Sequence, residues 1–303
     1  MSSSTGKQPG GKGRAAAAAA GREHARALRE VRRARDRRRR LLLSVGAPVV
    51  AVVLVVATFL IIRANQSPSP TGSAAAPAGT ALETSLEAIP AATFDAVGVG
   101  TGAARPTPVT GAALSADGKP RVLYIGAEYC PFCAAQRWAV VTALSRFGTF
   151  SNLGVTRSAA KDSYPNTATL SFHGATYTSD LLAFTGVETT TNIPDPASGG
   201  YTKLDPLSPA DQQIDDKYNK DGSIPFVDFG NAFVIAGASY DPAVLQGLNQ
   251  SQIATQLADP NSAVAKHTLG AANMMTAVLC TLTKNQPSAV CGSTAVTSQK
   301  LTG

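Results

Sequence analysis

Cysteine and histidine are scarce in this chain of 303 residues, which contains only four Cys and three His. His173 and His267 each lack a nearby ligand partner in the sequence, although a role for His173 near a reactive site stays open. A zinc site of four thiolates would use every Cys, and its closing pair, Cys280 and Cys291, is too widely spaced for a tight zinc knuckle. We therefore expect no bound metal and no cofactor, and no internal repeat is evident.

Basic charge is also scarce outside one short segment. Residues 1–40 hold 13 Lys and Arg against 3 Asp and Glu, whereas the rest of the chain holds 14 and 17. The formal net charge of +7 therefore describes a basic tail on a mildly acidic body, and we expect no nucleic-acid partner. The tail ends in four consecutive arginines, Arg37 to Arg40, which is typical of the cytoplasmic flank of a membrane span.

The segment that follows the tail, residues 41–62, is a run of 22 residues without a charged side chain. This length crosses a hydrocarbon core of about 30 Å, and it exceeds the apolar region of a cleavable signal peptide, which has about 7–15 residues. The sequence predicts a single-pass anchor in the cell membrane, with residues 1–40 as a basic cytoplasmic tail and the body outside. Residues 63–88 are rich in Ala, Pro and Ser and predict a flexible linker.

The most informative stretch reads VLYIGAEYCPFCAAQRW, residues 122–138. Its apolar start predicts a buried strand, Gly126 and Ala127 break that strand, and a CPFC segment at 130–133 opens a helix. Pro131 suits a first helical turn because it has no N–H to satisfy there. A Cys at that point sees free amides and the positive end of the helix dipole, which favour a thiolate.

Two Cys three residues apart at a helix start can cycle between a disulfide and a dithiol. The same spacing also occurs in zinc sites and inert disulfides. The strand, the break and the helix around Cys130 and Cys133 favour redox chemistry over both.

The segment Ala127-Glu128-Tyr129-Cys130 is similar to the Ala-Glu-Trp-Cys segment of the thioredoxin superfamily. More widely, residues 86–291 resemble a membrane-anchored, actinobacterial-type thioredoxin-like family catalogued as domain of unknown function 929. The resemblance implies an α/β, thioredoxin-like fold over residues 89–303, preceded by the transmembrane helix. It also implies an insertion at about 160–222, before the strand that carries a cis-proline and beside the Cys pair.

The resemblance further implies roles for single residues. Cys130 would be the exposed nucleophile and Cys133 the buried resolving thiol. Pro225, in a cis peptide after Ile224, would hold the substrate chain against the pair. The residues expected to contact that chain are Pro131, Phe132 and Ile224.

One departure from the thioredoxin pattern bears on the direction of electron flow. Tyr124 stands six positions before Cys130, where that pattern has a buried acidic residue that helps to deprotonate the second Cys. Its absence favours an oxidant or isomerase over a reductant. Glu128 is interpreted as a solvated turn carboxylate.

The remaining pattern predicts helices and strands around this centre, with Trp138 as a core residue of the first long helix. Predicted strands begin at Phe94 and Val155, a strand or hairpin covers 167–177, and a hairpin joins 224–229 to 231–236. Predicted helices cover 134–147, 208–220, 242–248, 251–257 and 262–282.

Cys280 and Cys291 flank a polar segment of ten residues. Outside the cell such cysteines oxidise readily, and we expect a structural disulfide that ties the C-terminal tail to the last helix. The alternative is a second redox pair that exchanges electrons with Cys130 and Cys133.

We therefore expect a membrane-anchored, extracytoplasmic thiol–disulfide oxidoreductase that acts on exported Cys-containing proteins and exchanges electrons with a membrane redox partner. A thioredoxin-like copper protein is one alternative, with Cys130, Cys133 and one His as ligands. Thiolates suit Cu(I), but such carriers favour a C-x-x-x-C spacing. The other alternative is a binding module in which the CPFC pair is only a structural bridge.

Overall fold

The computed structural model of the chain describes residues 72 and 74–301, all of which belong to one compact unit. The predicted basic tail and the predicted anchor at 41–62 lie outside the described residues. None of the helices within the described ranges has the length and apolar character needed to cross a membrane.

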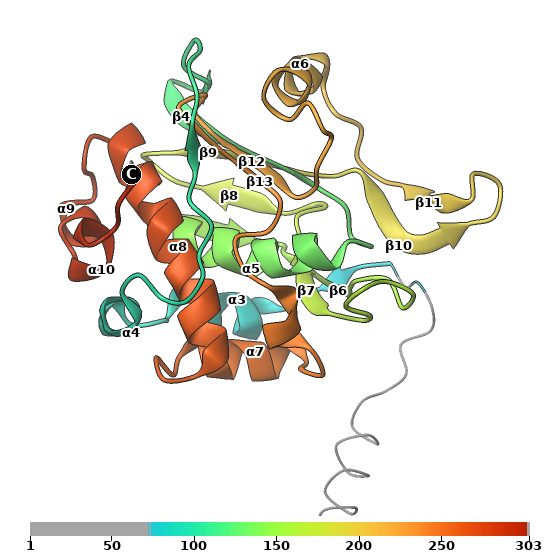
Figure 1. The fold of residues 1–303 in the computed structure, drawn as a ribbon, viewed down its shortest axis with the longest axis horizontal. Helices are drawn as coiled ribbons and strands as arrows, with labels where there is room; N and C mark the ends of the chain where they lie inside the picture. Colours follow the sequence, from blue (N-terminus) through green and yellow to red (C-terminus); the bar gives the residue numbers. More distant parts are fainter. Residues whose placement is uncertain (1–71, 73, 302–303) are drawn as a thin grey trace, which may run out of the picture. The chain divides into compact units, whose positions relative to one another are not determined.

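The described chain is a mixed α/β structure (Figure 1). The strands are β1 (Ala76–Pro77), β2 (Thr107–Pro108), β3 (Ser115–Ala116), β4 (Lys119–Gly126), β5 (Thr149–Ser151), β6 (Gly154–Arg157), β7 (Ala168–Ser171), β8 (Thr176–Thr178), β9 (Ala183–Glu188), β10 (Thr190–Asp195), β11 (Gly200–Lys203), β12 (Phe226–Phe229) and β13 (Phe233–Ala236). The helices are α3 (Thr80–Glu87), α4 (Ala91–Val97), α5 (Pro131–Leu144), α6 (Pro209–Tyr218), the 3₁₀ helix η2 (Pro242–Leu245), α7 (Gln250–Leu257), α8 (Ala263–Leu282), α9 (Ser288–Cys291) and α10 (Thr294–Thr297).

The central sheet has the order β2-β13-β12-β4-β3, with β9 also pairing to β4. Strands β4 and β9 run parallel in the register Arg121↔Ala183 to Gly126↔Glu188, while β12 is antiparallel to both β4 and β13. Part of the segment 160–222, which the sequence predicts to be an insertion, belongs to this sheet, because its strand β9 pairs with β4. β9 reads AFTGVE, and its Ala, Gly and Glu, which are depleted in strands, make it hard to recognise in the sequence.

Both faces of β4 are covered, which explains its continuous apolar run. Val122 and Tyr124 point into the large core shared with α5 and α8. Leu123 and Ile125 point into a smaller core that α6 completes. Figure 1 shows α5 and α8 on one side of this sheet and α6 on the other.

Helix α5 confirms the predicted helix after the CPFC segment and packs along α8. Trp138 is fully buried in it, as predicted, and its indole N–H donates to the Ala168 carbonyl at 3.1 Å. Helix α8 confirms the helix predicted at 262–282, and the hydroxyl of its N-cap residue Ser262 accepts the Ala265 N–H.

Two predicted segments near the amino end of the body are wrong. Residues 91–97 form helix α4 instead of a strand, since Pro90 caps a run that opens with two alanines and Gly98 ends it at φ 58°. The predicted linker at 63–88 includes helix α3, whose Leu86 is buried in the core.

The segment 167–177, predicted as a strand or hairpin, forms β7 and the start of β8. These strands pair with β6 and β5 and not with each other.

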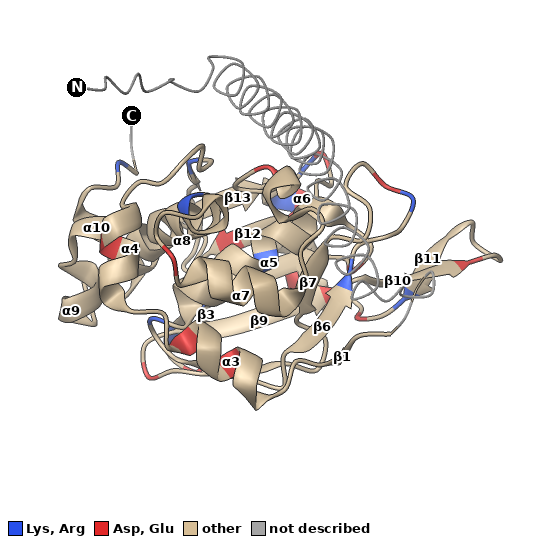
Figure 2. Cartoon of the chain, turned by 90° about the horizontal axis from the view of Figure 1, so that it is seen from below, with Lys and Arg blue, Asp and Glu red and all other residues tan. Residues whose placement is uncertain are grey.

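Cys280 and Cys291 form a disulfide, the pairing that the sequence predicts. It ties α9 to the carboxyl end of α8, and α10 packs on α4 and α8. Acidic and basic residues are interspersed along the described chain (Figure 2).

Candidate redox site

The site begins where β4 ends and α5 starts. Cys130 is the N-cap residue of α5, and its Sγ accepts the Cys133 N–H at 3.2 Å. This thiol therefore replaces the Ser, Thr or Asp oxygen that usually caps a helix. Cys133 lies within the first turn and is fully buried, whereas Cys130 is 5% exposed. The order of exposure is the predicted one, but Cys130 is far less exposed than the sequence implied.

The two thiols have opposite pKa shifts. The pKa of Cys130 is lowered, mainly because the Cys133 thiol donates a hydrogen bond to it, with further stabilisation from the Cys133 N–H and the Arg137 charge. Burial raises the pKa of Cys133 well above its ordinary value, and its donation to Cys130 adds to this rise. These shifts favour the thiolate at Cys130 and the protonated thiol at Cys133.

Ile224 and Pro225 lie next to the pair. The Cys130 thiol is 3.9 Å from the Ile224 carbonyl oxygen. The Ile224–Pro225 peptide bond is cis, as predicted. The Pro225 carbonyl accepts the Gly237 N–H at 2.7 Å, which fixes this loop to the end of β13. Residues that are 94 positions apart in the chain thus meet at the Cys130 sulfur.

An open groove of about 590 Å³ runs beside this contact. Its lining comprises Gly102, Ala104, Phe132, Tyr164, Ser223, Ile224, Gly237, Ala238, Ser239, Tyr240 and Asp241. Of the predicted contact residues, Phe132 and Ile224 line the groove and Pro131 does not. The Phe132 side chain is 40% exposed. It is one of two large apolar side chains in the described ranges that are exposed to solvent.

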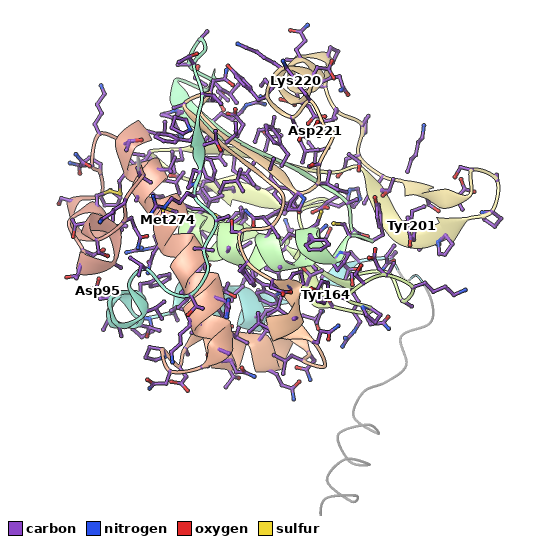
Figure 3. All side chains as sticks on the ribbon, viewed as in Figure 1. Asp95, Tyr164, Tyr201, Lys220, Asp221 and Met274 are labelled. Atoms are coloured by element: carbon purple, nitrogen blue, oxygen red, sulfur yellow. A yellow bond between two sulfur atoms is a disulfide. The ribbon has the colours of Figure 1, made fainter. Side chains whose placement is uncertain are left out.

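Two pairs of aromatic side chains lie at the CPFC turn. Phe132 makes an edge-to-face contact with Tyr164, with ring centroids 5.7 Å apart. Tyr129 stacks on Tyr201 at 4.3 Å, which brings the β10–β11 hairpin against the CPFC turn. Figure 3 labels Tyr164 and Tyr201, on separate segments near the amino end of α5. Sequence reasoning missed both tyrosines, because they stand more than thirty residues after the motif and no local pattern marks them.

A buried ion pair lies beneath the motif. Arg137 and Glu188 are both 0% exposed. The Arg137 Nε and Nη2 donate to the two Glu188 carboxylate oxygens at 2.8 and 2.6 Å, and Nη2 also donates to the Ala127 carbonyl at 2.7 Å. The sequence shows Arg137 as one more charge on a helix, and only the parallel pairing of β9 with β4 brings Glu188 to it.

Glu128 was predicted to be a solvated turn carboxylate, and this prediction is wrong. The side chain is 1% exposed and accepts the Ser171 hydroxyl hydrogen bond at 2.6 Å. Burial raises its pKa, which the Ser171 hydrogen bond only partly offsets. The turn that carries Glu128 is covered by β7 and by the Thr190 carbonyl, to which the Glu128 N–H donates.

Neither of the two histidines in the described residues belongs to a candidate metal cluster with the thiols. His173 Nδ1 lies 2.7 Å from the Asp205 carboxylate, and half of its side chain is exposed. His267 packs against Tyr240 at the start of α8. Among the described residues, no group of three or more His, Cys, Asp and Glu is placed to hold a metal ion.

The disulfide lies at the far end of β12 from the site. A Cβ on Gly230, which follows β12, would contact the Leu282 side chain at 3.1 Å, and Leu282 is two residues after Cys280. Ile224 is six residues before Gly230, a distance of about 20 Å in an extended strand. This separation favours a structural disulfide over a relay that exchanges directly with Cys130.

Residues 106–195 match the model of the family described as Domain of unknown function (DUF929). The match confirms the family named from the sequence over these residues, which include β4, the Cys pair and α5. No curated protein and no solved structure matches the chain.

Proposed function

We propose that this protein is a membrane-anchored, extracytoplasmic thiol–disulfide oxidoreductase with a thioredoxin-like fold. One observation carries the proposal: the Cys130 Sγ caps α5 by accepting the Cys133 N–H, and it lies 3.9 Å from the Ile224 carbonyl oxygen. A thiol at a helix start, with a second thiol one turn in and an open groove beside it, has what disulfide exchange requires.

The order of strands supports the thioredoxin-like fold. Strands β9, β4, β12 and β13 are neighbours, and only β9 and β4 are parallel. The Cys pair follows the central strand β4, helix α5 comes next, and α8 follows β13 after η2 and α7. The strand pairs β5–β8 and β6–β7 and the hairpin β10–β11 with α6 are additions on either side of β9.

The geometry supports a two-step exchange. In the reduced protein the Cys130 thiolate attacks a client disulfide, one client sulfur leaves as a thiolate, and a mixed disulfide forms. Cys133 then loses its proton and attacks Cys130, the client leaves as a dithiol, and the pair becomes a disulfide. In the reverse direction a client thiolate attacks Cys130 and Cys133 leaves as a thiolate. A second client thiolate then attacks the client sulfur of the mixed disulfide, Cys130 leaves as a thiolate, and the client gains the disulfide.

The groove beside Ile224 suits an extended client segment. The Ile224 carbonyl faces the Cys130 sulfur, and Phe132 with Tyr164 offers an exposed aromatic surface next to it. Aromatic groups supply contact area to client chains of different sequence, which suits an enzyme that acts on several exported proteins.

Two features support an extracytoplasmic location of the body: the sequence before it and the second cysteine pair. The charge-free run at 41–62 after four arginines predicts an anchor with the body outside. A structural disulfide at Cys280–Cys291 suits an oxidising compartment.

The test is capture of clients as mixed disulfides in cells that produce the full chain. Cys133→Ala removes the resolving thiol and should accumulate disulfide-linked adducts that thiol reductants release on gels. Cys130→Ala is the matched control and should give none. Equal adduct levels in the two variants, or none in either, would refute the proposal.

A further inference from the structure

Arg137 lies directly beneath the Cys pair. It follows Cys133 by four residues and Cys130 by seven, so all three side chains share one face of α5. The Ala127 carbonyl accepts both the Cys130 N–H and an Arg137 N–H. The backbone of Ala127 also hydrogen-bonds to the Cys133 thiol. One residue thus connects the guanidinium group to both cysteines.

Glu188 fixes the orientation of this cation. Both carboxylate oxygens accept from Arg137, and Oε1 also accepts the Phe172 N–H at 3.2 Å. The Glu188 side chain comes from β9, directly opposite Gly126 in the parallel register. Arg137 Nη1 is buried without a hydrogen-bond partner among the described residues, so the carboxylate binds only part of the guanidinium group.

Stability alone gives little reason for this ion pair. A fully buried ion pair contributes no more to stability, on average, than an apolar pair of the same volume. The neighbouring Tyr124 adds no charge, because burial raises the pKa of its phenol well above the ordinary value. The Arg137 charge, by contrast, lowers the pKa of Cys130 and opposes the rise in the pKa of Cys133.

We infer that Arg137, oriented by Glu188, is a positioning residue that makes the Cys130–Cys133 disulfide a stronger oxidant. This inference rests on the proposed function and adds the direction of electron transfer, from the client to the Cys pair. When a client thiolate attacks Cys130, the Cys130–Cys133 bond breaks and Cys133 leaves as a thiolate. A second client thiolate then attacks the client sulfur, the client disulfide forms, and Cys130 leaves as a thiolate.

Two electrons pass from the client to the pair in these steps, and the client thiols release two protons to the pair and the solvent. Both displaced sulfurs are anions next to the Arg137 cation. A charge that stabilises the thiolates stabilises the reduced form, and a dithiol protein with a stabilised reduced form is a better oxidant.

The test measures the equilibrium constant between the oxidised pair of the full chain and reduced glutathione, together with the pH profile of Cys130 alkylation. Arg137→Met with Glu188→Gln removes the cation and keeps an acceptor for the Phe172 N–H. We expect the equilibrium constant to fall about tenfold, which corresponds to a reduction potential about 30 mV lower. The pH profile of Cys130 alkylation should move to higher pH. Glu188→Gln alone keeps the cation and removes its counter-charge, so both quantities should move in the opposite direction.

The matched control is the ion pair of Arg121 and Asp211, at the other end of β4. Arg121→Met with Asp211→Asn should leave the constant and the alkylation profile unchanged. The inference would be overturned if the equilibrium constant moved in the same direction in the double variant and in Glu188→Gln alone. A change of less than twofold in both variants would also overturn it. Where the double variant does not fold, Glu188→Gln decides by the sign of its shift. A wild-type pair that does not exchange with glutathione would refute the proposed function itself.

Discussion

Removing the Cys280–Cys291 disulfide should weaken the fold and leave the chemistry of Cys130 intact. The bridge closes a loop with a sequence separation of 11, for which the chain-entropy model gives about 3 kcal/mol at 25 °C. In a domain of this size each kcal/mol shifts Tm by about 2–4 °C, so Tm should fall by about 6–12 °C. The C-terminal segment should stay attached, because Ala295 and Val296 are buried and the Asp95 carboxylate accepts the Ala295 N–H.

The assay compares the wild-type chain with Cys280→Ala/Cys291→Ala by thermal unfolding and by glutathione exchange at Cys130. The disulfide is separated from Ile224 by the length of β12, and we therefore expect the same exchange rate in both proteins. A variant that keeps the wild-type Tm but loses turnover would refute this reasoning. Such a result would make the second pair an electron relay.

Three further predictions concern single positions. Burial raises the pKa of Asp228 to about 6, so the folded state holds this proton more tightly than the unfolded state and loses stability as pH rises from about 4 to about 6. Asp228→Asn should therefore raise the unfolding free energy by about 1–3 kcal/mol at pH 7, and the gain should vanish toward pH 4; a gain that is constant with pH would contradict this. Gly270→Ala should lower the unfolding free energy in urea by about 1–3 kcal/mol, because its Cβ would lie 2.7 Å from the Gly100 Cα; a neutral effect would show that the two backbones are not in contact. Phe132→Ala should leave stability within about 0.5 kcal/mol, since its side chain is 40% exposed, and should reduce client adducts in the Cys133→Ala background; undiminished adducts would place client binding elsewhere.

The central part of this structure follows from local sequence signals. The apolar run before Gly126 is strand β4, and Cys130 and Pro131 are the cap and first residue of α5. Ser208 and Ser262 cap α6 and α8 as their sequences predict. These features depend on residues that are adjacent in the chain, so the sequence alone is enough to locate them.

The parts that sequence reasoning missed depend on long-range pairing. Strand β9 has no strong alternation of its own and is identified only by its parallel register with β4. Glu128 is in a turn, and its burial depends on β7 and on the Ser171 hydroxyl. Arg137 and Glu188 are 51 residues apart, and no local pattern indicates that they form an ion pair.

The central claim is that Cys130 and Cys133 are a reversible redox pair. The most direct test is equilibration of the full chain in glutathione buffers of graded potential, with the Cys130–Cys133 disulfide quantified by mass spectrometry after acid trapping. We predict one two-electron transition at a potential above about −300 mV, the value below which structural disulfides typically lie. A pair that stays oxidised or stays reduced across the whole range would contradict the account.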